Sequence, residues 1–163
     1  MATTEAVDTR TSSLADIGLL VLRIGLGATV AFMEGAGWRL PTVCAVMVST
    51  AETLGGLGLL FGVLTPLAAF AVIAAMLDAW AANVSAGAFW SEPFNVPFLV
   101  AFGAATLLFT GAGAYSVDAR VFGRTRWSPR LAGGLLILAI AAAILTWAVL
   151  NGTNPIHFTA PTS

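Results

Sequence analysis

Five apolar segments, each about as long as a bilayer is thick, constrain this chain more than any other feature. A helix needs roughly 20 mostly apolar residues to cross the hydrocarbon core of a membrane. Backbone N–H and C=O groups inside lipid must be paired within the segment, so a helix is the conformation expected for each of them. The sequence therefore predicts an all-α fold, a polytopic membrane helix bundle. Its spans are expected at about residues 14–33, 42–63, 66–86, 96–114 and 129–150.

The arginines predict how these spans are oriented. Of 163 residues only 9% are charged, and four of the seven arginines fall between the fourth and fifth spans, at positions 120, 124, 126 and 130. Loops rich in arginine face the cytoplasm. We therefore predict a multi-pass protein of the cell (inner) membrane, with its N-terminus cytoplasmic and its C-terminus outside. Arginines beside a span are typical of a topology determinant, so no nucleic-acid partner is expected.

Single copies of cysteine and histidine exclude several classes of redox protein. Cys44 is the only cysteine and His157 the only histidine. One cysteine cannot form an intramolecular disulfide, and one histidine cannot build a bis-histidine haem or a histidine-rich metal site. The sequence thus shows no motif for a metal, a haem or a flavin.

Helix starts and helix packing are both indicated by short patterns. Thr65-Pro66 and Ser128-Pro129 each place a capping residue before a proline, which suits the first turn of a helix. In the second span, Gly58 and Gly62 form a small-xxx-small pair of the kind that lets membrane helices approach closely. Helical spacing also places Gly55 and Gly62 on the same side as Glu52.

Three charged residues near the middle of the first three spans mark a candidate site. They are Arg23, Glu52 and Asp78, and each costs roughly 2.5 to 3.5 kcal/mol to place at a helix centre. We expect them to face one another or a wet cavity, with one of the two carboxyl groups holding or sharing a proton at neutral pH. Such a cluster is either a clamp between helices or a polar pocket for a small molecule.

The pocket interpretation assigns roles to individual residues. Arg23 would anchor a quinone head group or an acidic sulfur species, and Glu52 or Asp78 would transfer its proton. Trp80, two residues after Asp78, would form a pocket wall. The aromatic loop with Trp90 would flank the entrance.

Other ordered patterns in the chain resemble the DoxX/DoxD family of small membrane proteins. They are LRIGLG at 22–27, AETLGGLGLLFGVLTPLAAFAVIAAM at 51–76 and GAGAYSVDA at 111–119. The resemblance places Arg23 and Glu52 in family motifs, and it places Tyr115 with Asp118 in a closing motif. Tyr115 is accordingly a candidate for quinone or substrate binding.

The resemblance implies a four-helix DoxX-like core, and this chain adds a fifth, C-terminal transmembrane helix. We divide the chain into a cytoplasmic tail (1–13), the core (14–120), a basic loop with the fifth helix (121–150) and a C-terminal tail (151–163). Many relatives have His-Gly where this chain has Glu34-Gly35, so no histidine acts there. Glu34 lies on the polar stripe of the first span that holds Arg23, and it is a candidate binding residue.

Three functions fit these residues. In the first, the chain is an integral membrane subunit of a quinone-linked oxidoreductase, with quinone as acceptor and thiosulfate as donor in the version closest to DoxD, which resembles the small subunit of thiosulfate:quinone oxidoreductase. In the second, it is a non-catalytic assembly or scaffold subunit. In the third, it is a small-solute transporter. The expected partners are the lipid bilayer and either a further membrane-associated subunit or a second copy of the chain.

Overall fold

The computed structural model describes the backbone of residues 2–87, 89–156 and 158, and the side chains of those residues from position 15 onward. His157 lies outside the described residues. Contacts along the chain divide it into two units, Met1–Val46 (unit 1) and Met47–Ser163 (unit 2). Each unit is considered by itself.

Unit 1 is dominated by one long helix. This helix, α1, covers Ala2–Gly35, and its apolar part, Ala15–Gly35, is 21 residues long. The helix ends because Gly37 adopts a left-handed conformation with φ of 79°. Its N–H donates to the Glu34 carbonyl over 3.0 Å, and the Trp38 N–H donates to the Met33 carbonyl over 3.0 Å. These bonds satisfy carbonyls at the helix end that would otherwise lack partners.

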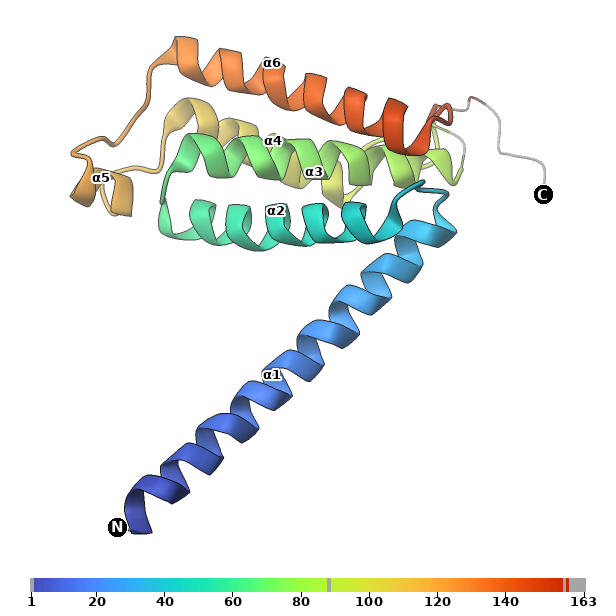
Figure 1. Cartoon of the computed structure of the whole chain (residues 1–163). Helices are drawn as coiled ribbons and strands as arrows, with labels where there is room; N and C mark the ends of the chain where they lie inside the picture. The colour runs from blue at the N-terminus through green and yellow to red at the C-terminus, as the bar shows by residue number, and fades with distance from the viewer. Residues whose placement is uncertain (1, 88, 157, 159–163) are drawn as a thin grey trace. The chain divides into compact units, whose positions relative to one another are not determined.

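Unit 2 contains the remaining helices, and α3 is at its centre. The helix α2 (Pro41–Phe61) begins in unit 1 and continues into unit 2, where α3 (Thr65–Ser85), α4 (Val96–Thr110), α5 (Val117–Val121) and α6 (Pro129–Thr146) follow. A π-helical turn, η1, continues α6 over Trp147–Asn151. The central helix α3 packs against both α4 and α6 (Figure 1). All described elements are helical, which confirms the predicted fold class.

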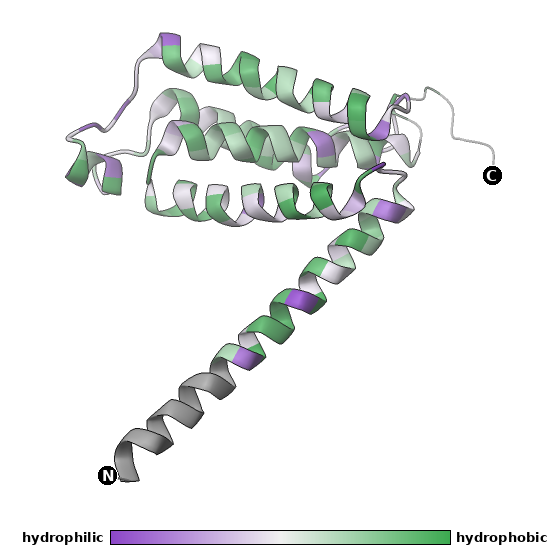
Figure 2. Cartoon of the chain, in the orientation of Figure 1, coloured by the Kyte–Doolittle hydropathy of each residue, from purple (hydrophilic) through white to green (hydrophobic). Residues whose placement is uncertain are grey.

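In unit 2, α4 and α6 are more hydrophobic than the segment that connects them. Figure 2 shows α4 and most of α6 as hydrophobic or neutral, while hydrophilic residues gather in the segment from α5 to the start of α6. The core between the helices is built largely from alanine, with Ile73 and Leu108 as its most deeply buried large side chains. Small side chains let helices in lipid approach closely enough for dispersion contacts to hold them together.

The length of α4 differs from the prediction. The span predicted over 96–114 ends at Thr110, because Gly111 and Gly113 adopt φ values of 80° and 76°. A positive φ takes the backbone out of the helical region, and glycine adopts it without steric cost. The resulting helix has 15 residues. The apolar segments in α1, α2, α3, and α6 with η1 have 21 to 23 residues.

Glycines determine how closely α2 and α3 pack. A β-carbon built on Gly55 would lie 2.7 Å from Val72 Cγ2, and one built on Gly58 would lie 2.7 Å from the Ala68 side chain. The close approach expected at these glycines is therefore present. Gly62 differs from the prediction, because α2 ends at Phe61 and Gly62 lies in the following turn with φ of 63°.

Replacing Gly55 with alanine should weaken the α2–α3 contact. The added methyl group would overlap Val72, and overpacking of this kind costs about 1–3 kcal/mol. We expect Gly55→Ala to lower the thermal unfolding midpoint in detergent micelles.

The neighbouring Gly56→Ala is a matched control, because no atom lies within 4 Å of the β-carbon position at Gly56. Both variants gain the same helix propensity, so Gly56→Ala should leave the midpoint unchanged or raise it slightly. Equal midpoints for the two variants would contradict the packing argument.

Candidate functional site

The turn between α2 and α3 is tight and strained. Leu64 precedes α3 with φ of 46° and ψ of 45°, a left-handed conformation that is unfavourable for a residue with a branched side chain. The Leu64 side chain makes no capping hydrogen bond at the start of the helix. The sequence predicted that Thr65 would cap α3, but Thr65 is the first residue of the helix. The cap must therefore come from elsewhere in the chain.

Asp118 supplies this cap from more than 50 residues away. Its Oδ1 accepts a hydrogen bond from the Leu64 N–H over 2.7 Å, and its Oδ2 accepts one from the Thr65 N–H over 2.9 Å. The Trp127 Nε1–H also donates to Oδ2 over 3.3 Å. In return, the Asp118 N–H donates to the Gly62 carbonyl over 2.9 Å. The α2–α3 turn and the loop before α6 are thereby joined at the same end of unit 2.

Buried hydrogen bonds keep the Asp118 carboxyl charged. The side chain is 1% exposed, and burial by itself disfavours the charged form. The hydrogen bonds from Thr65 and Leu64, with a further one from Trp127, outweigh this effect and lower the pKa of Asp118 below its ordinary value of 3.8. A carboxylate beside the N-terminus of α3 is also stabilised by the helix dipole.

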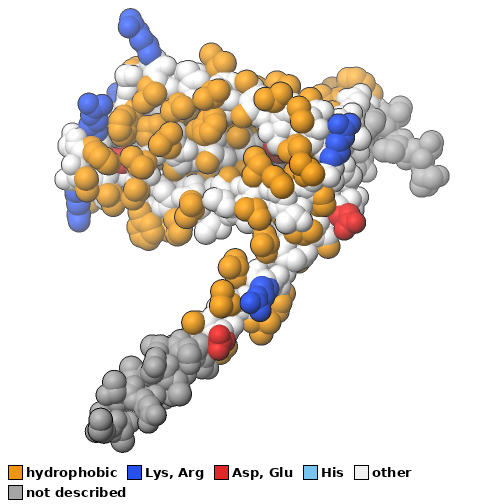
Figure 3. Space-filling model, in the orientation of Figure 1, with side chains coloured by type: hydrophobic (Ala, Val, Ile, Leu, Met, Phe, Trp, Pro, Cys, Tyr) orange, Lys and Arg blue, Asp and Glu red, His pale blue; other side chains and the backbone are white. Residues whose placement is uncertain are grey.

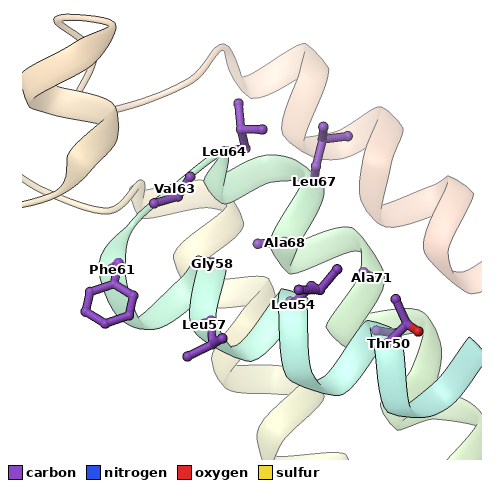
Figure 4. A pocket seen from close by; sticks show the side chains of 12 residues that line it. Thr50, Leu54, Leu57, Gly58, Phe61, Val63, Leu64, Leu67, Ala68 and Ala71 are labelled. Atoms are coloured by element: carbon purple, nitrogen blue, oxygen red, sulfur yellow. The ribbon is translucent and has the colours of Figure 1, made fainter. Parts of the chain in front are cut away.

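An apolar groove runs along the surface between α2 and α3, beside this turn. Its volume is about 490 Å³, within the range of small-molecule sites. Figure 4 shows Leu54, Leu57 and Phe61 on the α2 side and Leu67, Ala68 and Ala71 on the α3 side. Val63 and Leu64 line the end of the groove at the turn. Because Asp118 holds the Leu64 backbone, the hydrogen bonds of Asp118 also position this end of the groove.

Asp78 lies on the face of α3 that borders the groove. It follows Leu67 by 11 residues and Ala71 by seven, spacings that keep the three within about 40° of one line along the helix. The carboxylate is half-buried and lies about 10 Å beyond Ala71 along the helix axis. The structure gives Asp78 no hydrogen bond or ion pair with any described residue.

Glu52 lies on a different face of α2. Helical spacing turns it about 160° from Leu54 and about 140° from Leu57, two residues that line the groove. Its side chain is exposed in unit 2, and it too has no hydrogen bond or ion pair with the part of the chain that the structure describes. Gly55, which also lines the groove and lies against Val72 of α3, is about 60° from Glu52. Glu52 is therefore turned away from the open side of the groove at Leu54 and Leu57, whereas Asp78 lies on the face of α3 that borders the groove.

The three aromatic candidates lie in separate places. The Trp80 Nε1–H donates to the Pro93 carbonyl over 2.9 Å, so this side chain ties the loop between α3 and α4 to α3. Trp90, in the same loop, is 68% exposed and makes ring contacts with Phe89 and Phe158 at centroid distances of 4.9 Å and 6.0 Å. Tyr115 is 95% exposed and follows α4. Trp90 and Tyr115 are at opposite ends of unit 2, so one small head group cannot touch both.

The remaining candidates, Arg23 and Glu34, are exposed on α1 in unit 1. The predicted cluster of Arg23 with Glu52 and Asp78 joins residues of the two units, and it stays a prediction. No group of three or more potential metal ligands from His, Cys, Asp and Glu was found among the described residues.

Sequence reasoning missed the two features that shape the site. Asp118 was indicated only by the closing motif of the family, and no local pattern connects it to Thr65 across 53 positions. The groove was missed because its lining side chains are apolar, and an apolar side chain in a span is expected to face lipid.

These helices define a class of protein. Four segments of the described part of the chain are long and apolar enough to cross a membrane: the part of α1 from Ala15 onward, α2, α3, and α6 with η1. The helix α4 is a shorter apolar helix. The protein is therefore a multi-pass helical membrane protein.

Comparison with known families agrees with this class and is more specific. The model of the DoxX family matches residues 12–85, so this part of the chain is similar to that family. The predicted resemblance is confirmed over that range, which holds Arg23, Glu52 and Asp78. Searches of the curated proteins and of the solved structures returned no match.

Replacing Asp118 with asparagine should destabilise unit 2. The amide can accept through one oxygen only, and its NH₂ group would face an N–H donor of the turn. Losing hydrogen bonds to a buried charged group costs about 2 kcal/mol. We expect a lower thermal unfolding midpoint for Asp118→Asn, whereas Glu92→Gln, an amide substitution at an exposed loop position, should leave the midpoint unchanged.

The effect should depend on pH in a defined direction. Because folding lowers the pKa of Asp118, its contribution to stability is complete above the ordinary value of 3.8 and is lost as the pH falls through the lower folded value. The midpoints of wild type and Asp118→Asn should differ by a constant amount from pH 8 to pH 5 and converge below about pH 4. A difference that disappears near pH 6 would show that this carboxylate is not held as described.

Proposed function

We propose that this chain is an integral membrane subunit of a quinone-linked oxidoreductase, located in the cell (inner) membrane. The observation that carries the proposal is the apolar groove on α2 and α3, bordered by the face of α3 that holds Asp78. A quinone has an apolar side chain and a ring with two carbonyl oxygens. It therefore fits a site that combines apolar walls with a proton-carrying group.

The groove and the carboxylate would have separate tasks. The walls at Leu54, Leu57 and Leu67 would hold the apolar part of the quinone through dispersion contacts, because packing and not removal from water favours association inside a bilayer. Asp78 would donate a proton to a carbonyl oxygen of the ring. Arg23 of unit 1 keeps the role that the sequence predicts for it, as an anchor for a quinone carbonyl or an anionic donor.

The reaction balances with two donor ions and one acceptor. Two thiosulfate ions would lose one electron each and join through a new S–S bond as tetrathionate. The quinone would take these two electrons and two protons, one delivered by Asp78 and one from water, to become a quinol. A reduced sulfur oxyanion such as thiosulfate is the donor class that the DoxD resemblance favours. It would pass its electrons to the quinone directly or through a partner subunit.

Removing the carboxyl group of Asp78 should slow quinone reduction. General acid catalysis by a positioned side chain contributes about 10²–10⁴-fold to a rate. We expect Asp78→Asn to lower thiosulfate-dependent quinone reduction at least about tenfold in membranes that hold the chain and its partner subunit. Glu52→Gln, on the other face of α2, should have a smaller effect. Equal rates in wild type and Asp78→Asn would refute the role of Asp78.

Filling the groove tests quinone binding separately from chemistry. We expect protein purified in mild detergent to carry bound quinone, measured by extraction and mass spectrometry, and Ala71→Phe to lower its occupancy. Ala141→Phe, at an exposed position of α6, is the matched control and should retain it. Co-purification of another membrane subunit without quinone would favour the scaffold function. Accumulation of a labelled solute in proteoliposomes would favour the transporter.

A further inference from the structure

The loop between α4 and α6, together with the first turn of α6, presents four guanidinium groups at one end of unit 2. Figure 3 shows arginine side chains, in blue, projecting from the end that carries α5. The four residues are exposed, and none of them has an ion pair with a residue that the structure describes. They are Arg120, Arg124, Arg126 and Arg130.

No exposed acid between positions 111 and 130 offsets this charge. Asp118 is the only carboxylate in that range, and it is 1% exposed with its oxygens turned toward Leu64, Thr65 and Trp127. Its negative charge interacts with the N-terminus of α3. The loop and the first turn of α6 consequently carry four positive charges on their outer surface.

The loop is also held in a fixed shape. A β-carbon on Gly111 would collide with the Thr125 carbonyl and lie 2.9 Å from Arg126 Cα. The start of the loop therefore contacts its later part at Thr125 and Arg126. The Arg124 N–H donates to the Asp118 carbonyl over 3.2 Å. The Arg124 guanidinium lies 5.3 Å from the centre of the Trp127 ring. The arginines are therefore presented by an ordered segment, which lowers the entropy lost when an anion binds.

The position of the loop selects the partner. It begins after Thr110, where α4 ends, and it stops before Pro129, where α6 begins, so a bilayer around these apolar helices would place it at the level of the lipid head groups. Exposed apolar side chains accompany the charges: Tyr115 is 95%, Val121 66% and Phe122 49% exposed. Basic residues beside transmembrane helices are attracted to anionic lipids, and aromatic side chains settle at the same depth.

We propose that Arg120, Arg124, Arg126 and Arg130 form a binding surface for the phosphate groups of anionic phospholipids in the adjacent leaflet. This surface goes beyond setting the orientation of the chain, because it predicts a lipid preference in the folded protein. The proposal does not depend on the quinone site.

The test is a lipid competition in nanodiscs. Purified protein is reconstituted with equimolar phosphatidylglycerol and phosphatidylcholine, re-extracted in mild detergent, and its retained lipids are quantified by mass spectrometry. We expect wild type to retain roughly fivefold more phosphatidylglycerol than phosphatidylcholine. Replacing Arg120, Arg124 and Arg126 together with glutamine should bring the ratio close to one, and raising the salt concentration should lower it in wild type.

Matched controls separate binding from folding and orientation. The triple lysine variant keeps the charge and should keep most of the preference. Orientation in the cell does not affect the reconstituted sample, and helical circular dichroism and the unfolding midpoint show whether the glutamine variant is folded. A folded glutamine variant with the wild-type ratio would overturn the proposal. So would a lysine variant that loses the preference as fully as the glutamine variant.

A further arm distinguishes lipid phosphate from free phosphate. Inorganic phosphate should reduce phosphatidylglycerol retention no more than sodium chloride at equal ionic strength. Specific displacement by inorganic phosphate would assign the surface to a soluble anion and would overturn the lipid assignment.

Discussion

The carboxylate of Asp118 is the interaction on which the arrangement of unit 2 depends. Two successive N–H groups, of Leu64 and Thr65, would lack partners at the start of α3, where Thr65 is only 1% exposed. An unpaired buried polar group costs about 1–3 kcal/mol. One side chain satisfies both and holds Leu64 in a left-handed conformation that leucine rarely adopts. The turn that connects α2 and α3 can therefore be short only because a distant loop completes it.

Close packing and the groove have the same origin. Gly55 and Gly58 bring α2 against Ala68 and Val72. Larger side chains, such as Leu54 and Leu67, stand on either side of the groove beyond this narrow contact. Glycine and alanine at the contact have no long side chains, so they cannot fill the space between the larger side chains that flank the contact. The groove is thus a consequence of how the helices pack.

The sequence was sufficient to predict the helices, but it did not predict where α4 ends or which residue caps α3. Apolar length alone predicts a transmembrane helix, since lipid allows few other conformations. Ser128 was correctly expected to cap α6, because its side chain accepts a local hydrogen bond from the Leu131 N–H. Thr65 failed as a cap, because the competing acceptor is far away in sequence and contact across 53 positions leaves no local signal. The end of α4 was missed because glycine is also common inside membrane helices, so only the backbone conformation at Gly111 reveals it.

The shortness of α4 affects the lipid around it. Fifteen residues rise only about 22 Å along a helix axis, whereas the hydrocarbon core of a typical bilayer is about 30 Å thick. A helix of this length would cross such a bilayer only with thinned lipid beside it or with flanking residues completing the path. In the first case the membrane surface would be depressed beside α4, and a lipid-soluble molecule would have a shorter path between the two leaflets there.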